Sequence, residues 1–219
     1  MSVTVSLNLP EAAVSFLAPA LSRALFVANN EDISPTVFQA LDLKASDIVV
    51  QYNKPMFFDA LAGIQCHKVH FVYPNHLNSA WGFAEDGTPE LDYAAQERTR
   101  LTFMVATVIP GRIRPYLDGL GEAAQSMSIL LDRNGAMHSY PPGKLPSGGF
   151  VSVSFFRFLN WVRNRRNSSP MQLITLGFTG QYKPGTFWNG HDFRFEQQCY
   201  GTWLDLHRLN ADGTLTTAT

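Results

Sequence analysis

Two periods of apolar residues mark the first fifty positions of the chain. Every second residue is apolar over residues 3–9, which is the pattern of a half-buried strand. Over residues 14–28 apolar residues recur every three or four positions, which predicts a helix that Pro19 bends or splits. A serine followed by a proline then predicts a short helix over residues 34–43. The chain is expected to open with a strand followed by helices.

Further apolar runs predict strands in the middle of the chain. Residues 48–52 and 68–73 have this character, and the stretch between them, residues 55–63, predicts one or two helical turns. The strongest run covers residues 101–109 and predicts a buried strand at the centre of the sheet.

An Asn134-Gly135 turn signal favours a hairpin between residues 126–131 and 136–140, because this dipeptide readily adopts the positive φ angles of a two-residue turn. A helix over residues 122–131 is the alternative. The Pro-rich and Gly-rich residues 141–149 then predict a loop and the one break in the chain.

The last third of the chain combines one predicted helix with several predicted strands. Residues 150–153 alternate like a strand, and residues 155–166 have one aromatic and one basic helical face. Most of the last fifty residues, including the segment 192–209, are interpreted as strands joined by glycine-rich connections.

These elements predict an α+β fold in a single domain of residues 1–219. The sheet is expected to be mainly antiparallel with helices packed on one face, and ferredoxin-like elements are one form it could take. An all-β sandwich of the capsid type is the alternative. The residues expected in the core are Val5, Leu7, Leu17, Leu21, Leu25, Phe103, Val105 and Leu173.

Composition and charge exclude several classes of protein. The chain of 219 residues is 45% hydrophobic and 16% charged with a net charge of −1, so it can bury a core and lacks the excess charge of disordered chains. The same balance excludes a tail-driven polyanion binder. The first thirty residues lack the basic start of a secretion signal, and we expect a cytoplasmic protein without a membrane partner.

Metal and cofactor motifs are absent from the sequence. Cys66 and Cys199 lie far apart and outside any zinc spacing, and no Walker or GxGxxG motif occurs, so no cofactor is predicted. His67, His70 and His76 are clustered, but a strand would point the first two to opposite faces, so no metal site is expected.

His191, followed by Asp192, is the candidate for acid–base chemistry. A glycine-led turn would expose this imidazole, and the neighbouring carboxylate could tune its pKa near neutrality. If the protein is a hydrolase or a nuclease, His191 is the expected general base.

Arginine and aromatic side chains alternate in the predicted helix 155–166. Guanidinium groups bind phosphates and ring faces stack on unpaired bases, which favours RNA or single-stranded DNA as a partner. An amphipathic helix that buries its rings in the core would have the same pattern. The candidate binding residues, with those of a second aromatic stretch, are Arg157, Trp161, Arg163, Arg165, Arg166, Lys183, Trp188 and Arg194.

The predicted opening order of strand, helix and strand is similar to that of the ferredoxin-like RNA-binding subunits of bacterial RNA-guided defence complexes. The resemblance covers about the first fifty residues and implies a topology only. With the arginine and aromatic helix, it favours a non-enzymatic RNA-binding subunit of a larger assembly, in contact with other protein subunits. A hydrolase or nuclease and a viral capsid subunit are the alternatives.

Overall fold

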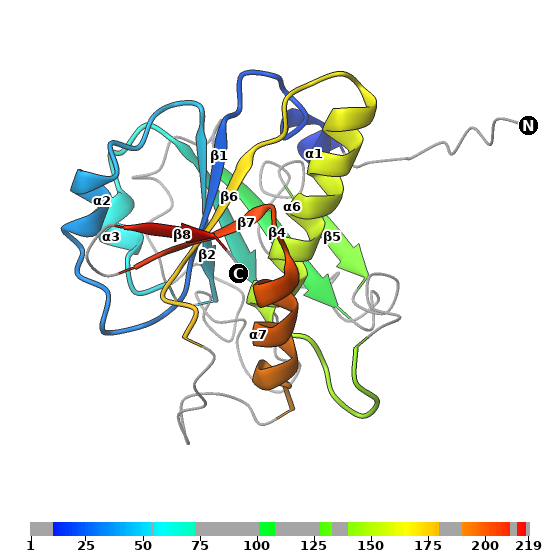
Figure 1. The fold of residues 1–219 in the computed structure, drawn as a ribbon. Coiled ribbons are helices and arrows are strands. Elements are labelled where there is room, and N and C mark those ends of the chain that lie inside the picture. The colour runs from blue at the N-terminus through cyan, green and yellow to red at the C-terminus, as the bar shows by residue number, and fades with distance from the viewer. Residues whose placement is uncertain are drawn as a thin grey trace, which may run out of the picture.

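A parallel sheet with helices on both faces organises the described part of the chain (Figure 1). The structure is a computed structural model that describes residues 11–53, 55–72, 101–107, 128–132, 140–179, 190–210 and 214–217. Its helices are α1 (Glu11–Ser15), α2 (Val37–Ala40), α3 (Phe58–Leu61), α6 (Gly148–Arg165) and α7 (Phe193–Thr202). Its strands are β1 (Arg23–Val27), β2 (Asp47–Tyr52), β3 (His67–Val72), β4 (Leu101–Thr107), β5 (Ser128–Asp132), β6 (Gln172–Leu176), β7 (Leu206–Leu209) and β8 (Leu215–Thr217).

The eight strands lie in the order β5-β4-β3-β2-β1-β6-β7-β8. Every neighbouring pair is parallel except β7 and β8. The fold is therefore of the α/β type, and the prediction of a mainly antiparallel sheet is wrong. So is the all-β alternative, and the parallel order also differs from the antiparallel sheet of a ferredoxin-like fold.

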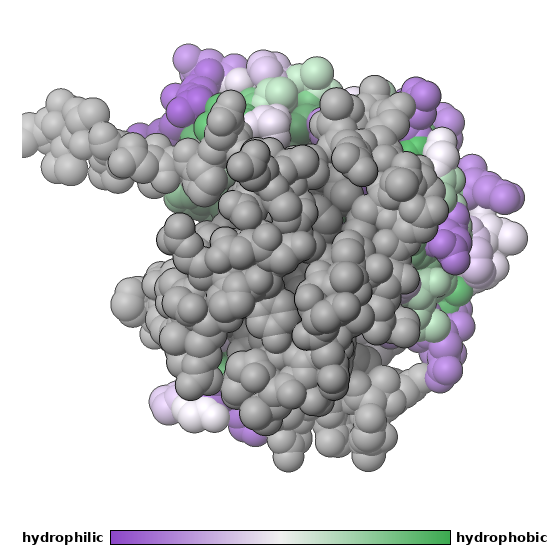
Figure 2. All heavy atoms as spheres, turned by 180° about the vertical axis from the view of Figure 1, so that it is seen from behind, coloured by the Kyte–Doolittle hydropathy of each residue, from purple (hydrophilic) through white to green (hydrophobic). Residues whose placement is uncertain are grey.

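Both faces of the central strands are buried, which explains their near-continuous apolar sequences. Ala24 and Phe26 of β1 face one cluster of buried residues, to which α1, α6 and α7 contribute. Leu25 and Val27 face a second cluster, which includes side chains of α2 and α3. Seen from behind, the described residues at the rim of the molecule are mainly hydrophilic, with smaller apolar areas among them (Figure 2).

The predicted helix over residues 14–28 is largely wrong. Helix α1 ends at Ser15, and residues 23–27 form the strand β1. Because β1 is buried on both faces, all its positions but the first are apolar, and some of them match a helical spacing by chance. The predicted opening strand at residues 3–9 lies outside the described residues.

Two predicted strands in the last third belong to helices. Residues 150–153 lie within α6, whose buried apolar side chains recur every third position, at Phe150, Val153, Phe156, Leu159 and Val162. Residues 193–202 form α7, in which the buried Glu196 and Tyr200 are four positions apart. The Val-Ser alternation at the start of α6 matches a strand pattern, but the longer helical stripe decides the conformation.

Several local predictions are confirmed. Strands β2, β3 and β4, and the short helices α2 and α3, lie at the predicted places. Strand β4 is second from one end of the sheet, however, and not central. The helical alternative at residues 122–131 is wrong for residues 128–131, which belong to β5.

The core predictions hold where they can be compared. Leu17, Leu21, Leu25 and Leu173 are buried. Val5, Leu7 and the side chains of Phe103 and Val105 lie outside the described part. None of the helices in the described residues combines the length and the apolar content that a membrane span requires.

Candidate functional site at the carboxyl edge of the sheet

The strand order reverses direction at β1. From β1 the chain adds β2 to β5 on one side, and after α6 it returns to place β6 on the other side of β1. In open parallel sheets, ligands bind beyond the carboxyl ends of the strands at such a switch point. A ligand site is therefore expected at the residues that follow β1 and β6.

Two asparagines directly after β1 connect the loops at this edge. Asn30 Nδ2 donates a hydrogen bond of 3.2 Å to the carbonyl of Gly177, which follows β6. Asn29 Nδ2 donates to the carbonyl of Tyr52 at 2.9 Å, and Asn29 Oδ1 accepts from the N–H of Met56 at 3.2 Å. The loops after β1, β2 and β6 are thereby held together.

The first turn of α6 lies at the same edge, because α6 runs antiparallel to the strand that follows it. A Cβ atom on Gly149 would lie 2.4 Å from Cε1 of Phe178, and one on Gly148 would lie 3.0 Å from Cε1 of Phe71. The two glycines therefore allow the start of the helix to pack closely on the rings beside it.

The start of α6 also offers hydrogen-bond donors. Ser147 caps the helix, and its hydroxyl accepts from the N–H of Phe150 at 3.1 Å. The N–H groups of Gly148 and Gly149 belong to the first turn, where a helix supplies no acceptor, and no other described residue accepts from them. Together with the helix dipole they favour an anion here.

His191 is held by the loop that leads into this turn. Its Nδ1 lies 2.7 Å from the carbonyl oxygen of Leu145, which can only accept, so Nδ1 carries the proton. The N–H of Leu145 donates in return to the carbonyl of Gly190 at 2.9 Å. In the neutral ring, Nε2 is then the nitrogen that can accept a proton.

A buried carboxylate joins the two parts of the site. Glu196, on α7, is 2% exposed. It accepts hydrogen bonds from the N–H of Ser147 at 2.7 Å, from the Ser147 hydroxyl at 2.6 Å and from the Tyr140 hydroxyl at 2.8 Å. Burial and the charge of Glu196 raise the pKa of Tyr140. Sequence reasoning missed Glu196, although its spacing of four from Tyr200 was a helical signal.

Comparisons with protein-family models, with curated proteins and with solved structures found no match to this chain. The function is therefore inferred from the site itself.

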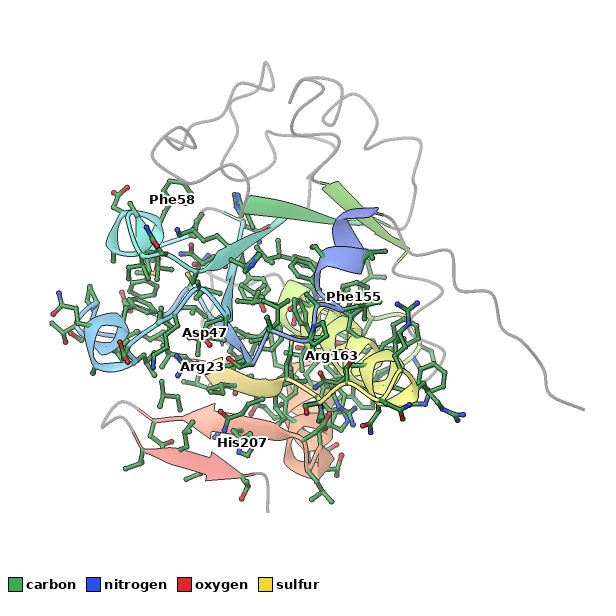
Figure 3. The ribbon with its side chains drawn as sticks, turned by 90° about the horizontal axis from the view of Figure 1, so that it is seen from above. Arg23, Asp47, Phe58, Phe155, Arg163 and His207 are labelled. Atoms are coloured by element: carbon green, nitrogen blue, oxygen red, sulfur yellow. The ribbon has the colours of Figure 1, made fainter. Side chains whose placement is uncertain are left out.

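The structure gives the predicted nucleic-acid-binding arginines different roles. Arg163, labelled in Figure 3, is 1% exposed and donates hydrogen bonds to the carbonyls of Ala18, Leu21 and Ser169. Burial lowers its pKa. It is thus a structural residue that cannot reach a ligand in solvent.

Arg157 is paired within the protein. Its Nε donates to both carboxylate oxygens of Asp205, at 2.9 and 3.0 Å, and its guanidinium carbon lies 4.2 Å from the centre of the Trp203 ring. Arg194 is exposed on the first turn of α7. Lys183 and Trp188 lie outside the described residues.

The remaining candidates share the outer face of α6. Trp161 is 49% exposed, stacks on Phe158 and lies 5.2 Å from the guanidinium carbon of Arg165, and Arg166 is exposed next to it. A groove of about 500 Å³ runs along this face, lined by Ser154, Arg157, Phe158, Asn160, Trp161, Asn164, Pro170 and Asp205.

His70 has a structural position. It is 3% exposed, its Nε2 bonds to the carbonyl of Asn53, and burial lowers its pKa to about 4. His67 lies three residues earlier on β3 and therefore on the opposite face, and His76 is outside the described residues. Within the described ranges, no three His, Cys, Asp or Glu residues are grouped as metal ligands.

Proposed function

We propose that this protein is an enzyme that binds a phosphate-bearing small molecule of the nucleotide class at the carboxyl edge of the sheet, between β1 and β6. His191 is its general acid–base residue. The observation that supports this proposal is the convergence of two groups at one edge. These are the first-turn N–H groups of Gly148 and Gly149 and the imidazole that Leu145 orients.

Phosphate recognition follows from the backbone. A helix start with accessible N–H groups, placed at the switch point of a parallel sheet, is a recurrent binding site for the phosphates of nucleotides. The glycines let this turn pack against the rings of Phe71 and Phe178 at the edge of the sheet.

Proton transfer follows from the orientation of His191. Nδ1–H donates to the Leu145 carbonyl, so Nε2 is the nitrogen that can accept a proton. It can take that proton from a hydroxyl group or a water molecule when this group attacks the substrate. Hydrolysis and group transfer both need this step, and general acid–base catalysis typically contributes about 10² to 10⁴ in rate.

The phosphate site can be tested with two variants of one residue. Gly148 is the first residue of α6, where proline fits a helix, so Gly148→Pro removes one N–H. Gly148→Ala adds a Cβ but keeps the N–H, and serves as the matched control. In calorimetric titrations with nucleoside mono- and diphosphates, we expect Gly148→Pro to bind about 10-fold more weakly than Gly148→Ala, since a hydrogen bond to a charged group is lost.

His191→Ala should bind the same nucleotides as the wild type and lose turnover by about 10² or more. Absence of nucleotide binding at millimolar concentration, or equal affinities of the two Gly148 variants, would refute the proposal.

A second candidate function is the binding of single-stranded RNA or DNA along the outer groove of α6. It is supported by the exposed Trp161 beside Arg165 and Arg166, since rings stack on bases and guanidinium groups bind phosphates. Charge reversal of both arginines to Glu should weaken binding of a labelled ten-nucleotide strand and reduce the salt slope by about one to two. Replacement of both by Lys keeps the charge and is the control. Equal affinity of both double variants would exclude this mode of binding.

A further inference from the structure

We infer that Tyr140 and Glu196 are positioning residues for His191, and that they set the place of the imidazole relative to the first turn of α6. This inference rests on the proposed function. It starts from an unbroken series of hydrogen bonds, from the N–H of Asp192 through the Tyr140 hydroxyl to the Glu196 carboxylate, and from there to Ser147.

The direction of each hydrogen bond follows from the chemistry of its partners. An ionised carboxylate can only accept, so the single proton of the Tyr140 hydroxyl points to Glu196. The Tyr140 oxygen is then left to accept from the N–H of Asp192, at 2.9 Å. Asp192 directly follows His191 in the chain, so this bond restrains the backbone that carries the imidazole.

Ring packing restrains the same hydroxyl. The Tyr140 ring lies 5.6 Å from the ring of Phe150 on α6 and 5.1 Å from the ring of Phe195 on α7, measured between centres. The tyrosine therefore contacts both α6 and α7. A shift of its hydroxyl would displace one of these helices.

Capping of the helices does not account for the Tyr140 hydroxyl. Ser147 caps α6 through the N–H of Phe150, and Asp192 caps α7 through the N–H of Phe195. The N–H of Asp192 lies before the first turn of α7, and the Tyr140 bond to it stabilises the segment of His191 instead. The Glu196 carboxylate uses donors of Ser147 and leaves the N–H groups of Gly148 and Gly149 for a ligand.

A pair of Tyr→Phe variants separates positioning from packing. Tyr140→Phe removes the hydroxyl that bonds Asp192 and Glu196. Tyr200→Phe is the matched control, because Tyr200 lies in the same aromatic cluster and its buried hydroxyl has no hydrogen-bond partner among the described residues. Long-range ¹⁵N NMR of the imidazoles identifies which ring nitrogen of His191 carries the proton.

In the wild type and in Tyr200→Phe we expect a single tautomer with the proton on Nδ1. In Tyr140→Phe we expect a mixture of the two tautomers and a turnover lower by about 10-fold, while nucleotide affinity stays within about two-fold. Glu196→Gln keeps an acceptor for Ser147 and Tyr140, so its turnover and its fraction of the Nδ1–H tautomer should lie between those of the wild type and Glu196→Ala.

A Tyr140→Phe protein that keeps the single Nδ1–H tautomer would overturn the inference. This result does not depend on turnover, so it is distinct from a failure of the proposed function, which His191→Ala and the Gly148 variants report. If Glu196→Ala does not fold, the tautomers of His191 in the two Tyr→Phe variants still test the inference.

Discussion

The guanidinium of Arg163 donates a 2.8 Å hydrogen bond to the carbonyl of Leu21, which lies 142 residues earlier in the chain. Further bonds to the carbonyls of Phe16, Ala18 and Ser169 attach the last turn of α6 to the segment that leads into β1.

Arg163→Met should therefore destabilise the protein strongly. It would leave the buried carbonyls of Phe16 and Leu21 without these donors, and we expect the free energy of unfolding in urea to fall by about 3 kcal/mol. Arg165→Met, on the exposed face of the same turn, is the control and should change stability by about 0.5 kcal/mol or less. Similar losses in the two variants would contradict this assignment.

His70 predicts a loss of stability in acid. Its folded pKa of about 4 lies below the ordinary value of 6.5, so the folded protein favours the neutral ring. The contribution of neutral His70 to the free energy of unfolding is complete above pH 6.5. It is lost progressively as the pH falls to 4, by about 3 kcal/mol at most. His70→Gln, which keeps a donor for the Asn53 carbonyl but does not titrate, should flatten the pH profile between these values. An equally steep profile in this variant would assign the effect to other groups.

The contact of Gly149 with Phe178 predicts opposite effects of alanine at two helical glycines. Gly149→Ala places a Cβ 2.4 Å from the Phe178 ring and should destabilise by about 1 to 3 kcal/mol. Gly201→Ala, where the described residues place no atom within 4 Å of the new Cβ apart from its chain neighbours and the backbone of its own helix, should stabilise α7 by up to about 1 kcal/mol. Thermal unfolding measures both, and Phe178→Leu should restore part of the loss in a double variant.

Two substitutions of Asn29, which lies beside the switch point, are expected to differ in their effect on stability. Asn29→Asp keeps the acceptor for the Met56 N–H but turns a carboxylate toward the Tyr52 carbonyl, whereas Asn29→Ala loses both bonds. We expect Asn29→Ala to cost about 1 to 2 kcal/mol and Asn29→Asp to cost more at pH 7 than at pH 4. Chemical denaturation at the two pH values distinguishes them, and a pH-independent cost of Asn29→Asp would show that no carboxylate faces the carbonyl.

The sequence by itself determined where most strands lie and that the chain buries a large core. The apolar runs of β2, β3 and β4 are local signals, because a strand buried in a sheet needs apolar side chains whatever its neighbours are. The same signals do not contain the direction of pairing, which depends on long connections between strands. The near-continuous apolar run of β1 is typical of a strand buried on both faces of a parallel sheet, but it also matched a helical spacing and was assigned to a helix.

Only the tertiary structure decided the roles of the polar side chains. Arg163 and Arg165 have nearly the same sequence surroundings, yet one is buried against carbonyls of a distant segment and the other is exposed. His191 was a candidate from its own sequence. Its partner Leu145, and the bond between the buried Glu196 and Ser147, arise only when α6 and α7 pack together. Hydrogen bonds between residues 46 to 142 positions apart leave no local pattern, since each partner is chosen by the fold and not by its neighbours in the chain.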